Sequence, residues 1–386
     1  MAAPRLRRLS RTMPDETTLQ PSSTLPAPSS PTPMTAADVP DDARVRAMLA
    51  WLAGAPGGLA VDTSTMRPAS SDASFRRYFR FAQAGAGQPT VVVMDAPPSH
   101  EDVRPFVHVA GVLRAAGVHT PDILATDTAQ GFLLLSDLGS TTYLSALDQA
   151  RDAGDMRACD GLMRDALTAL VRLQGADGSG LPPYDEARLR TELDLFPAWY
   201  VGRHLGAELS GAEQAALSGV FEALLKNNLA QPRVPVHRDY HARNLMVLPE
   251  GQGNPGVLDF QDAVVGPITY DLVSLLRDAY IDWPEEQQLD WAIRYWEQAR
   301  AAGLPVQADF ADFYLDFEWM GLQRQLKVLG IFARLHHRDG KDQYLGDMPR
   351  VLGYARAVAG RYGVFAPLLR LFDRLQGVTP KAAYTF

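Results

Sequence analysis

The sequence predicts an α+β fold with two lobes, a small strand-rich lobe followed by a larger, mainly helical lobe. Three observations carry this prediction. Short β-branched and aromatic runs bounded by turn residues recur before residue 136. Apolar residues at helical spacing dominate after residue 139. The chain has 386 residues, 46% of them hydrophobic, which suffices for a large core without metal or disulfide support.

Composition divides the chain into four parts. Residues 1–40 hold eight of the 28 prolines and few large apolar side chains, so we expect a disordered tail there. An N-lobe follows over 41–135, a hinge over 136–139 and a C-lobe over 140–386. Four arginines stand near the start of the tail, but no apolar stretch follows them, and a secretory signal is not indicated.

The N-lobe elements follow from local patterns. Helical spacing of apolar residues predicts helices over 45–52 and 103–113. Four strands are expected, over 74–81, 90–94, 123–125 and 132–135.

The C-lobe pattern is helical with one interruption. Helices are expected near 162–173, 193–200, 273–280 and 310–334. Between them, two short apolar runs at 245–248 and 257–258 flank a turn rich in Gly and Pro, which predicts a β-hairpin.

Charge and cysteine content exclude several classes. The net charge is −8 and no long basic tract occurs, so binding to nucleic acid or a membrane surface through charge is not expected. The single cysteine, Cys159, excludes an internal disulfide and a zinc site of several thiolates. With no apolar run of membrane-spanning length, we expect a soluble, cytoplasmic protein.

The most informative segment runs from His237 to Asn244, with Asp259 fifteen residues after the asparagine. His237, Asp239 and Asn244 have the H-x-D-x-x-x-x-N spacing of a phosphoryl-transfer loop, and Asp259 ends the second strand of the hairpin. Such transfer needs a carboxylate beside the attacking hydroxyl, and oxygen ligands for Mg²⁺. The hairpin would bring these oxygens together.

Two other interpretations of this segment stay open. In the first interpretation, Asp239 and Asn244 only cap backbone groups of a polar turn. In the second, His237 and His241 would bind zinc, although no glutamate follows the first histidine as in H-E-x-x-H.

The segments 237–244, 258–262 and 266–272 resemble the aminoglycoside phosphotransferase family of small-molecule kinases. The resemblance covers residues 41 to 386 and implies a protein-kinase-like fold. Within the family, the stretches 71–79, 93–98 and 326–334 are similar to kinases that phosphorylate the anomeric hydroxyl of N-acetylmuramate and N-acetylglucosamine in cell-wall recycling.

The resemblance implies a role for each matching residue. Asp239 would be the catalytic base, and Asn244 and Asp259 would hold Mg²⁺. His237 and Asp271 would support the loop. The hinge would present backbone groups to the adenine of ATP, at Ser136 and Leu138.

Two departures from protein kinases affect the nucleotide site. Small residues replace the glycine-rich loop, so backbone amides and polar side chains would bind the phosphates there, at Ser71, Asp72 and Ser74. Met94 stands where a lysine is expected. Arg76 or Arg80 would then supply the positive charge, because a guanidinium binds phosphate well.

The acceptor pocket is expected in the C-lobe, from aromatic and polar side chains that suit a sugar. The candidates are Trp199, Asp262, Glu318 and Arg324. We expect an ATP- and Mg²⁺-dependent sugar kinase acting as a monomer. The alternatives are another acceptor, such as an aminoglycoside, choline or homoserine, or a nucleotide-binding pseudokinase.

Overall fold

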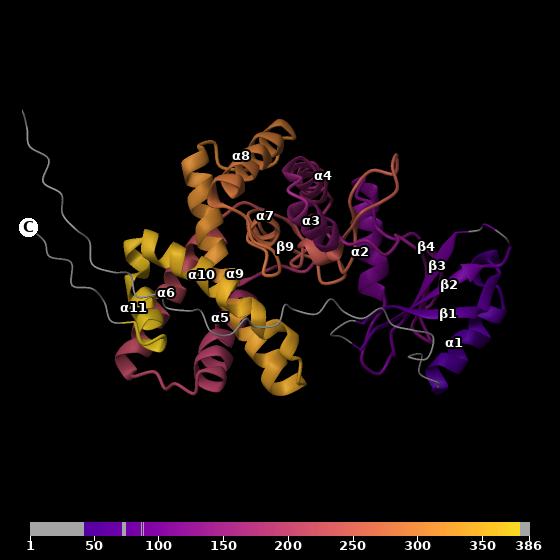
Figure 1. Cartoon of the computed structure of the whole chain (residues 1–386), viewed down its shortest axis with the longest axis horizontal. Coiled ribbons are helices and arrows are strands. Elements are labelled where there is room, and N and C mark those ends of the chain that lie inside the picture. The colour runs from indigo at the N-terminus through magenta and orange to yellow at the C-terminus, as the bar shows by residue number, and fades with distance from the viewer. Residues whose placement is uncertain (1–41, 72–74, 86, 88, 379–386) are drawn as a thin grey trace, which may run out of the picture. The chain divides into compact units, whose positions relative to one another are not determined.

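The computed structural model describes residues 42–71, 75–85, 87 and 89–378. The expected tail over 1–40 lies outside these residues, as do Asp72 and Ser74. The described chain has a strand-rich N-terminal part and a largely helical remainder, and the predicted α+β class is confirmed (Figure 1).

The N-terminal part is built on one antiparallel sheet with the strand order β1-β2-β3-β5-β4. Four strands match the predicted ones within a few residues, and β1 was not predicted. Pro68 and several polar residues lie in β1, and a proline is tolerated there because β1 is an edge strand. The strands are β1 (Val61–Ser71), β2 (Arg77–Gln83), β3 (Thr90–Asp95), β4 (Ile123–Asp127) and β5 (Phe132–Ser136).

Strand alternation gives the sheet two different faces. Helix α1 (Ala43–Ala53) covers one face, where Met48 packs in a cluster with Phe79 and Val93. The other face carries Tyr78 and Met94, which belong to the core cluster shared with the helical part of the chain. The sheet therefore presents one of its faces to the helices that follow it.

Helix α2 (Arg104–Ala115) joins this second face to the rest of the protein. Its buried residues lie in the same apolar cluster as Met94 and Leu133 of the sheet. Phe106 also contacts the ring of Phe260, at 4.7 Å between centroids. Residues just after the hairpin are thereby held against α2.

The remainder is helical, as predicted, with the long helix α9 packed against α7, α10 and a π-helical segment at Phe196–His204. None of the described helices is long and apolar enough to cross a membrane. The helices are α3 (Tyr143–Asp152), α4 (Met156–Gln174), α5 (Glu186–Leu193), α6 (Gly211–Ala230), α7 (Tyr270–Leu276), α8 (Glu285–Ala301), α9 (Phe310–Asp339), α10 (Met348–Arg361) and α11 (Ala366–Leu375).

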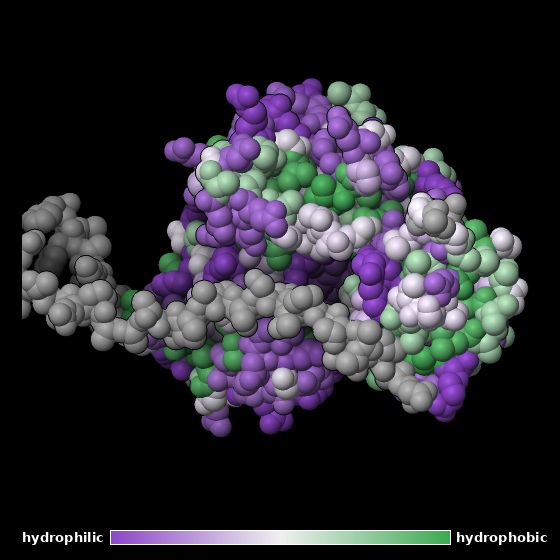
Figure 2. All heavy atoms as spheres, turned by 45° about the vertical axis from the view of Figure 1, so that its right-hand side comes forward, coloured by the Kyte–Doolittle hydropathy of each residue, from purple (hydrophilic) through white to green (hydrophobic). Residues whose placement is uncertain are grey.

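Two small antiparallel pairs interrupt the helices. Strands β6 (Arg233–Val236) and β9 (Val264–Pro267) pair with each other, and β7 (Leu245–Met246) pairs with β8 (Gly256–Val257). The predicted hairpin is therefore confirmed. Its first strand is shorter than expected, and its second strand ends at Val257, so Asp259 lies two residues beyond the strand that it was expected to end. On the face shown in Figure 2, hydrophobic residues gather at the right of the view, and hydrophilic residues dominate the lower half of the helical part.

Candidate active site

The predicted catalytic loop lies between β6 and β7 and ends in the short turn Ala242–Asn244. The backbone of Arg238 has a φ of +78°. That left-handed conformation costs a non-glycine residue about 1–3 kcal/mol and persists only where the surroundings hold it. Buried carboxylates hold this loop.

The first carboxylate is Asp271, in the first turn of α7. It accepts hydrogen bonds from the backbone amides of His237, at 2.6 Å, and Arg238, at 2.9 Å. The side chain is fully buried, and burial raises the pKa of Asp271 to about 6, although His237 and both amides act in the opposite direction. Its ionised form is the one that can accept both bonds.

The second carboxylate, Asp278, was not predicted. It accepts hydrogen bonds from the backbone amides of Ala242 and Tyr280, both at 2.9 Å. Burial raises the pKa of Asp278 to about 6 as well. Asp271 and Asp278 therefore fix the two ends of the loop.

The ring of His237 connects the loop to the hairpin. Its Nδ1 accepts a hydrogen bond from the amide of Asp239 at 3.2 Å, so Nε2 carries the proton and donates to the carbonyl of Leu258 at 2.9 Å. Leu258 in turn donates its amide to the carbonyl of Asn244 at 2.9 Å. The ring thus spans from the loop to the residue before Asp259.

These contacts bring Asp239, Asn244 and Asp259 together. The Nδ2 atom of Asn244 donates to the carbonyl of Asp239 at 2.9 Å and lies 3.5 Å from Oδ2 of Asp259. Asp259 has a φ of +60°, and its other oxygen accepts from Gln261 at 2.8 Å. One amide oxygen and one carboxylate suit Mg²⁺, which completes its shell with phosphate oxygens and water.

The charge around Asp239 favours its ionised form. Burial alone would raise the pKa of Asp239, but the positive charges of Lys327 and Arg324, together with His241, lower it. Both cations come from α9 and are almost fully buried, with 7% and 4% of each residue exposed. Arg324 carries an Nη1 atom without a hydrogen-bond partner within the described part of the chain.

A buried ionic network supports these cations. The carboxylate of Glu192 contacts Arg238, at 2.7 Å, and Lys327, at 3.1 Å, and it also accepts from the hydroxyl of Tyr184. Lys327 donates to the hydroxyl of Tyr270 at 2.8 Å. Neither Glu192 nor Lys327 was predicted to have a role. One feature of the sequence could have identified Lys327. It is a charged residue among apolar ones, three positions after Arg324 on the same helix.

The arginines predicted for the nucleotide site all have acidic partners. Arg80 binds the carboxylate of Asp137, at 2.5 and 2.8 Å, and the carbonyl of Gly139 at 2.6 Å. Arg80 therefore ties β2 to the expected hinge. Arg76 lies 3.8 Å from the carboxylate of Glu101.

Arg77 points to the opposite face of the sheet from Arg80, because the two residues are an odd number of positions apart in β2. It binds the fully buried carboxylate of Asp95 at the end of β3. It also binds Asp42, which caps α1. Arg77 therefore fastens α1 to the sheet.

The two hinge residues expected to contact adenine, Ser136 and Leu138, have different surroundings. Leu138 clusters with Met246, Leu248 and Leu258 of the hairpin region. Ser136 instead closes the end of β5, where its Oγ accepts from the amide of Asp122 at 2.7 Å. Ser71 is the last residue of β1.

The four acceptor candidates lie in different settings. Asp262 is exposed, beside Gln261 in the loop after Asp259, and Trp199 is half-buried against the core. Arg324 is buried within electrostatic reach of Asp239. Glu318 is 1% exposed, and its carboxylate oxygens contact Arg277, Arg361 and Tyr362. These contacts are typical of an internal ion pair, and they argue against contact of Glu318 with a substrate.

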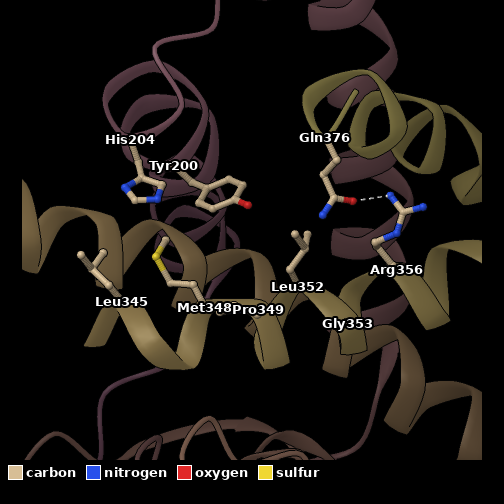
Figure 3. A pocket seen from close by; sticks show the side chains of 9 residues that line it. All are labelled: Tyr200, His204, Leu345, Met348, Pro349, Leu352, Gly353, Arg356 and Gln376. Carbon is tan, nitrogen blue, oxygen red and sulfur yellow. Dashed lines mark hydrogen bonds between the residues drawn. The ribbon is translucent and has the colours of Figure 1, made fainter. Parts of the chain in front are cut away.

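A separate pocket of about 380 Å³ lies between the π-helical segment and α10. Figure 3 shows Tyr200 and His204 above it and Arg356 beside Gln376 at its other end, joined by a 2.9 Å hydrogen bond. Its lining includes none of the predicted site residues.

Comparison with known proteins identifies the family of this chain. The model of the phosphotransferase enzyme family (APH) matches residues 65–306. The N-acetylmuramate/N-acetylglucosamine kinase of Pseudomonas aeruginosa is 49% identical, over 87% of this chain and 98% of the relative. The kinase of the same name from Neisseria meningitidis is 50% identical, over 80% and 90%.

Solved structures agree in fold. The complex of gentamicin with APH(2'')-IIa has a TM-score of 0.54 at 16% identity, covering 81% of this chain and 97% of that one. The ADP-bound aminoglycoside phosphotransferase APH(2'')-Ib has a TM-score of 0.51 at the same identity and coverage. From its loop geometry, its family match and its relatives, the chain is a kinase that belongs to the phosphotransferase enzyme family.

Proposed function

We propose that this enzyme transfers the γ-phosphoryl group of ATP to the anomeric hydroxyl of N-acetylmuramate and N-acetylglucosamine. The observation that carries the proposal is the meeting of Asp239, Asn244 and Asp259 in a loop held by buried acids. Relatives named for these two sugars, near 50% identity over most of both chains, support the choice of acceptor.

Asp239 is proposed to orient the acceptor hydroxyl and to take its proton. The new bond joins the sugar oxygen to the γ-phosphorus, while the bond to the β,γ-bridging oxygen breaks and ADP leaves. Because neighbouring cations lower the pKa of Asp239, the carboxylate is ionised at neutral pH and ready to accept a hydrogen bond. The proton then passes to solvent.

Asn244 and Asp259 are proposed to hold Mg²⁺, with His237 and Asp271 positioning them through the loop. The ion would neutralise charge on the β- and γ-phosphates. Asn244 also bonds to the backbone of Asp239, so the same residue fixes the distance between the metal site and the base.

For the nucleotide we propose Arg76 as the cation that replaces the missing lysine. Its partner Glu101 resembles the acid that pairs with the phosphate-binding lysine of protein kinases. Arg80 would act through the hinge, because Asp137 already neutralises it. Ser71, Asp72, Ser74, Ser136 and Leu138 stay predicted contacts of ATP.

The cations beside Asp239 weigh against the aminoglycoside alternative. An aminoglycoside is polycationic, and Arg324, a buried cation that lowers the pKa of Asp239 and has an unpartnered Nη1, would repel such an acceptor. The solved aminoglycoside kinases share only the fold with this chain, at 16% identity. We further propose that the enzyme is cytoplasmic and monomeric and does not bind nucleic acid.

Release of ADP in the presence of Mg²⁺ tests the proposal, with N-acetylmuramate, N-acetylglucosamine and kanamycin as separate acceptors. We expect turnover with both sugars and none with kanamycin. Turnover with kanamycin alone would support the aminoglycoside alternative. Binding of ATP without release of ADP, with any acceptor, would support the pseudokinase alternative.

A further inference from the structure

Arg243 is an exposed cation built into the catalytic loop itself. It lies four residues after Asp239 and directly before Asn244, in the turn Ala242–Asn244. The amide of Ala242 is held by the buried Asp278, and the carbonyl of Asn244 by Leu258. The backbone of Arg243 is therefore fixed on both sides relative to the base.

The guanidinium of Arg243 is also held in place. Its Cζ lies 4.4 Å from the ring centre of Tyr280 and 6.0 Å from that of Tyr344. Tyr344 stacks on Phe332 of α9, at 5.2 Å between ring centres. Stacking on aromatic faces limits the rotamers of an arginine, so less entropy is lost when it binds a ligand.

No carboxylate of the described residues forms an ion pair with Arg243, and this distinguishes it from three arginines at and before β2. Arg76, Arg77 and Arg80 all have acidic partners. A guanidinium that is fixed, exposed and unneutralised suits a planar anion with two oxygens, because it offers two parallel N–H donors.

The aromatic contacts continue from Arg243 toward the base. The ring of Tyr280 lies 5.3 Å from that of His241. His241 is within electrostatic reach of Asp239 and Arg324.

We propose that Arg243 binds a carboxylate on the acceptor sugar and thereby determines the preference between the two acceptors. This inference rests on the proposed function. N-acetylmuramate carries a lactyl ether, with a carboxylate, on the third carbon of the ring, two carbons from the anomeric centre. N-acetylglucosamine has a plain hydroxyl there. In this proposal the anomeric hydroxyl lies at Asp239 and the lactyl arm reaches Arg243, which is exposed four residues further along the same loop.

The test compares kcat/KM for the two sugars in the wild type and in Arg243→Ala. The contact is remote from the reacting bond, so it contributes to binding in the ground and transition states alike. We expect the ratio of kcat/KM for N-acetylmuramate to that for N-acetylglucosamine to fall roughly 10- to 100-fold, mainly through KM for N-acetylmuramate. Arg243→Lys should fall between, because it keeps the charge but not the paired donors.

The matched control is Arg300→Ala in α8. Arg300 is also exposed and lies over an aromatic ring, 4.6 Å from the centre of Trp296, but it is outside the catalytic loop. Its loss should leave the ratio unchanged.

The methyl ester of the lactyl group isolates the carboxylate. Wild type should lose about as much kcat/KM with the ester as Arg243→Ala loses with the acid, and the two losses should not add. Equal loss on both sugars in Arg243→Ala would overturn the proposal and make Arg243 part of the loop support. Full activity of Arg243→Ala on both sugars would overturn it as well. The proposed function itself fails separately, if the wild type phosphorylates neither sugar.

Discussion

The two sides of the proposed active site hold their charges in different ways. On the sheet, Arg77 and Arg80 are placed by strand alternation and neutralised by acids nearby, with 28% and 14% of their side chains exposed. Around the catalytic loop, buried acids fix the backbone, and Arg324 keeps an unpartnered nitrogen. On the sheet, ion pairs hold secondary-structure elements together. Around the catalytic loop, Arg324 has a nitrogen that could still bind a ligand. Substitutions on the two sides should therefore have different effects.

The largest effect is expected at the base. Asp239→Asn removes the proton acceptor but keeps the shape of the side chain, so kcat should fall about 10²- to 10⁴-fold with ATP affinity retained. Steady-state kinetics and calorimetric ATP binding measure the two quantities. Turnover close to that of the wild type would remove Asp239 from this role.

The metal ligands should come next, and they should differ from each other. Asp259→Ala removes the only charged ligand proposed here and should abolish Mg²⁺-dependent binding of ATP. Asn244→Ala removes a neutral ligand and should weaken this binding less. Calorimetric titration of ATP with and without Mg²⁺ separates the two. Equal affinity for Mg-ATP in Asp259→Ala and wild type would contradict the assignment of the hairpin end.

The buried acids predict opposite effects of pH on activity and stability. The pKa of Asp271 and Asp278 is about 6 in the fold, against about 4 for a free aspartate. Both groups bind protons more tightly when folded, so their contribution to stability is largest below pH 4 and is lost as the pH rises through 6.

Activity should change in the other direction, because the loop needs both carboxylates as acceptors. We expect turnover at saturating Mg-ATP to fall about tenfold per pH unit for each of the two carboxylates, and so about a hundredfold per pH unit well below pH 6. Asp278→Asn should remove part of this dependence and lower kcat at pH 7.5. If kcat stayed constant down to pH 5, the carboxylates would have no such role.

The smallest effects are expected on the sheet. Arg76→Ala should weaken ATP binding by about 1.5–3 kcal/mol, since a charged hydrogen bond is lost. Arg77→Ala should leave ATP affinity unchanged and lower thermal stability, because Asp95 is fully buried and would keep only Arg44 as a charged partner. Calorimetry and thermal melting distinguish the two variants. Arg76→Ala with unchanged affinity would assign the missing positive charge elsewhere.

The contrast between the sheet and the catalytic loop also explains which features could be predicted from the sequence. Strand alternation and β-branched runs predicted four of the five strands, and alternation placed Arg77 and Arg80 on opposite faces. Edge strand β1 was missed because its polar residues and Pro68 break the usual pattern. Local sequence patterns therefore predicted those elements whose geometry depends on residues close to one another in the sequence.

The support of the loop depends on residues far away in the chain. Asp271 was identified only through a family motif, and Asp278 and Glu192 were not identified at all. Glu192 lies 46 residues before its partner Arg238, and nothing local marks it as buried. Glu318 was expected to contact a sugar, but it lies in an internal ion pair whose partners are also distant in the sequence.

The most direct test of the account is the position of the transferred phosphate. The product formed from N-acetylmuramate with ATP and Mg²⁺ is examined by phosphorus NMR. We predict a sugar phosphate whose phosphorus couples to the anomeric proton, formed about 10²- to 10⁴-fold more slowly by Asp239→Asn. A phosphate on any other hydroxyl, or the same product at wild-type rate from Asp239→Asn, would contradict it.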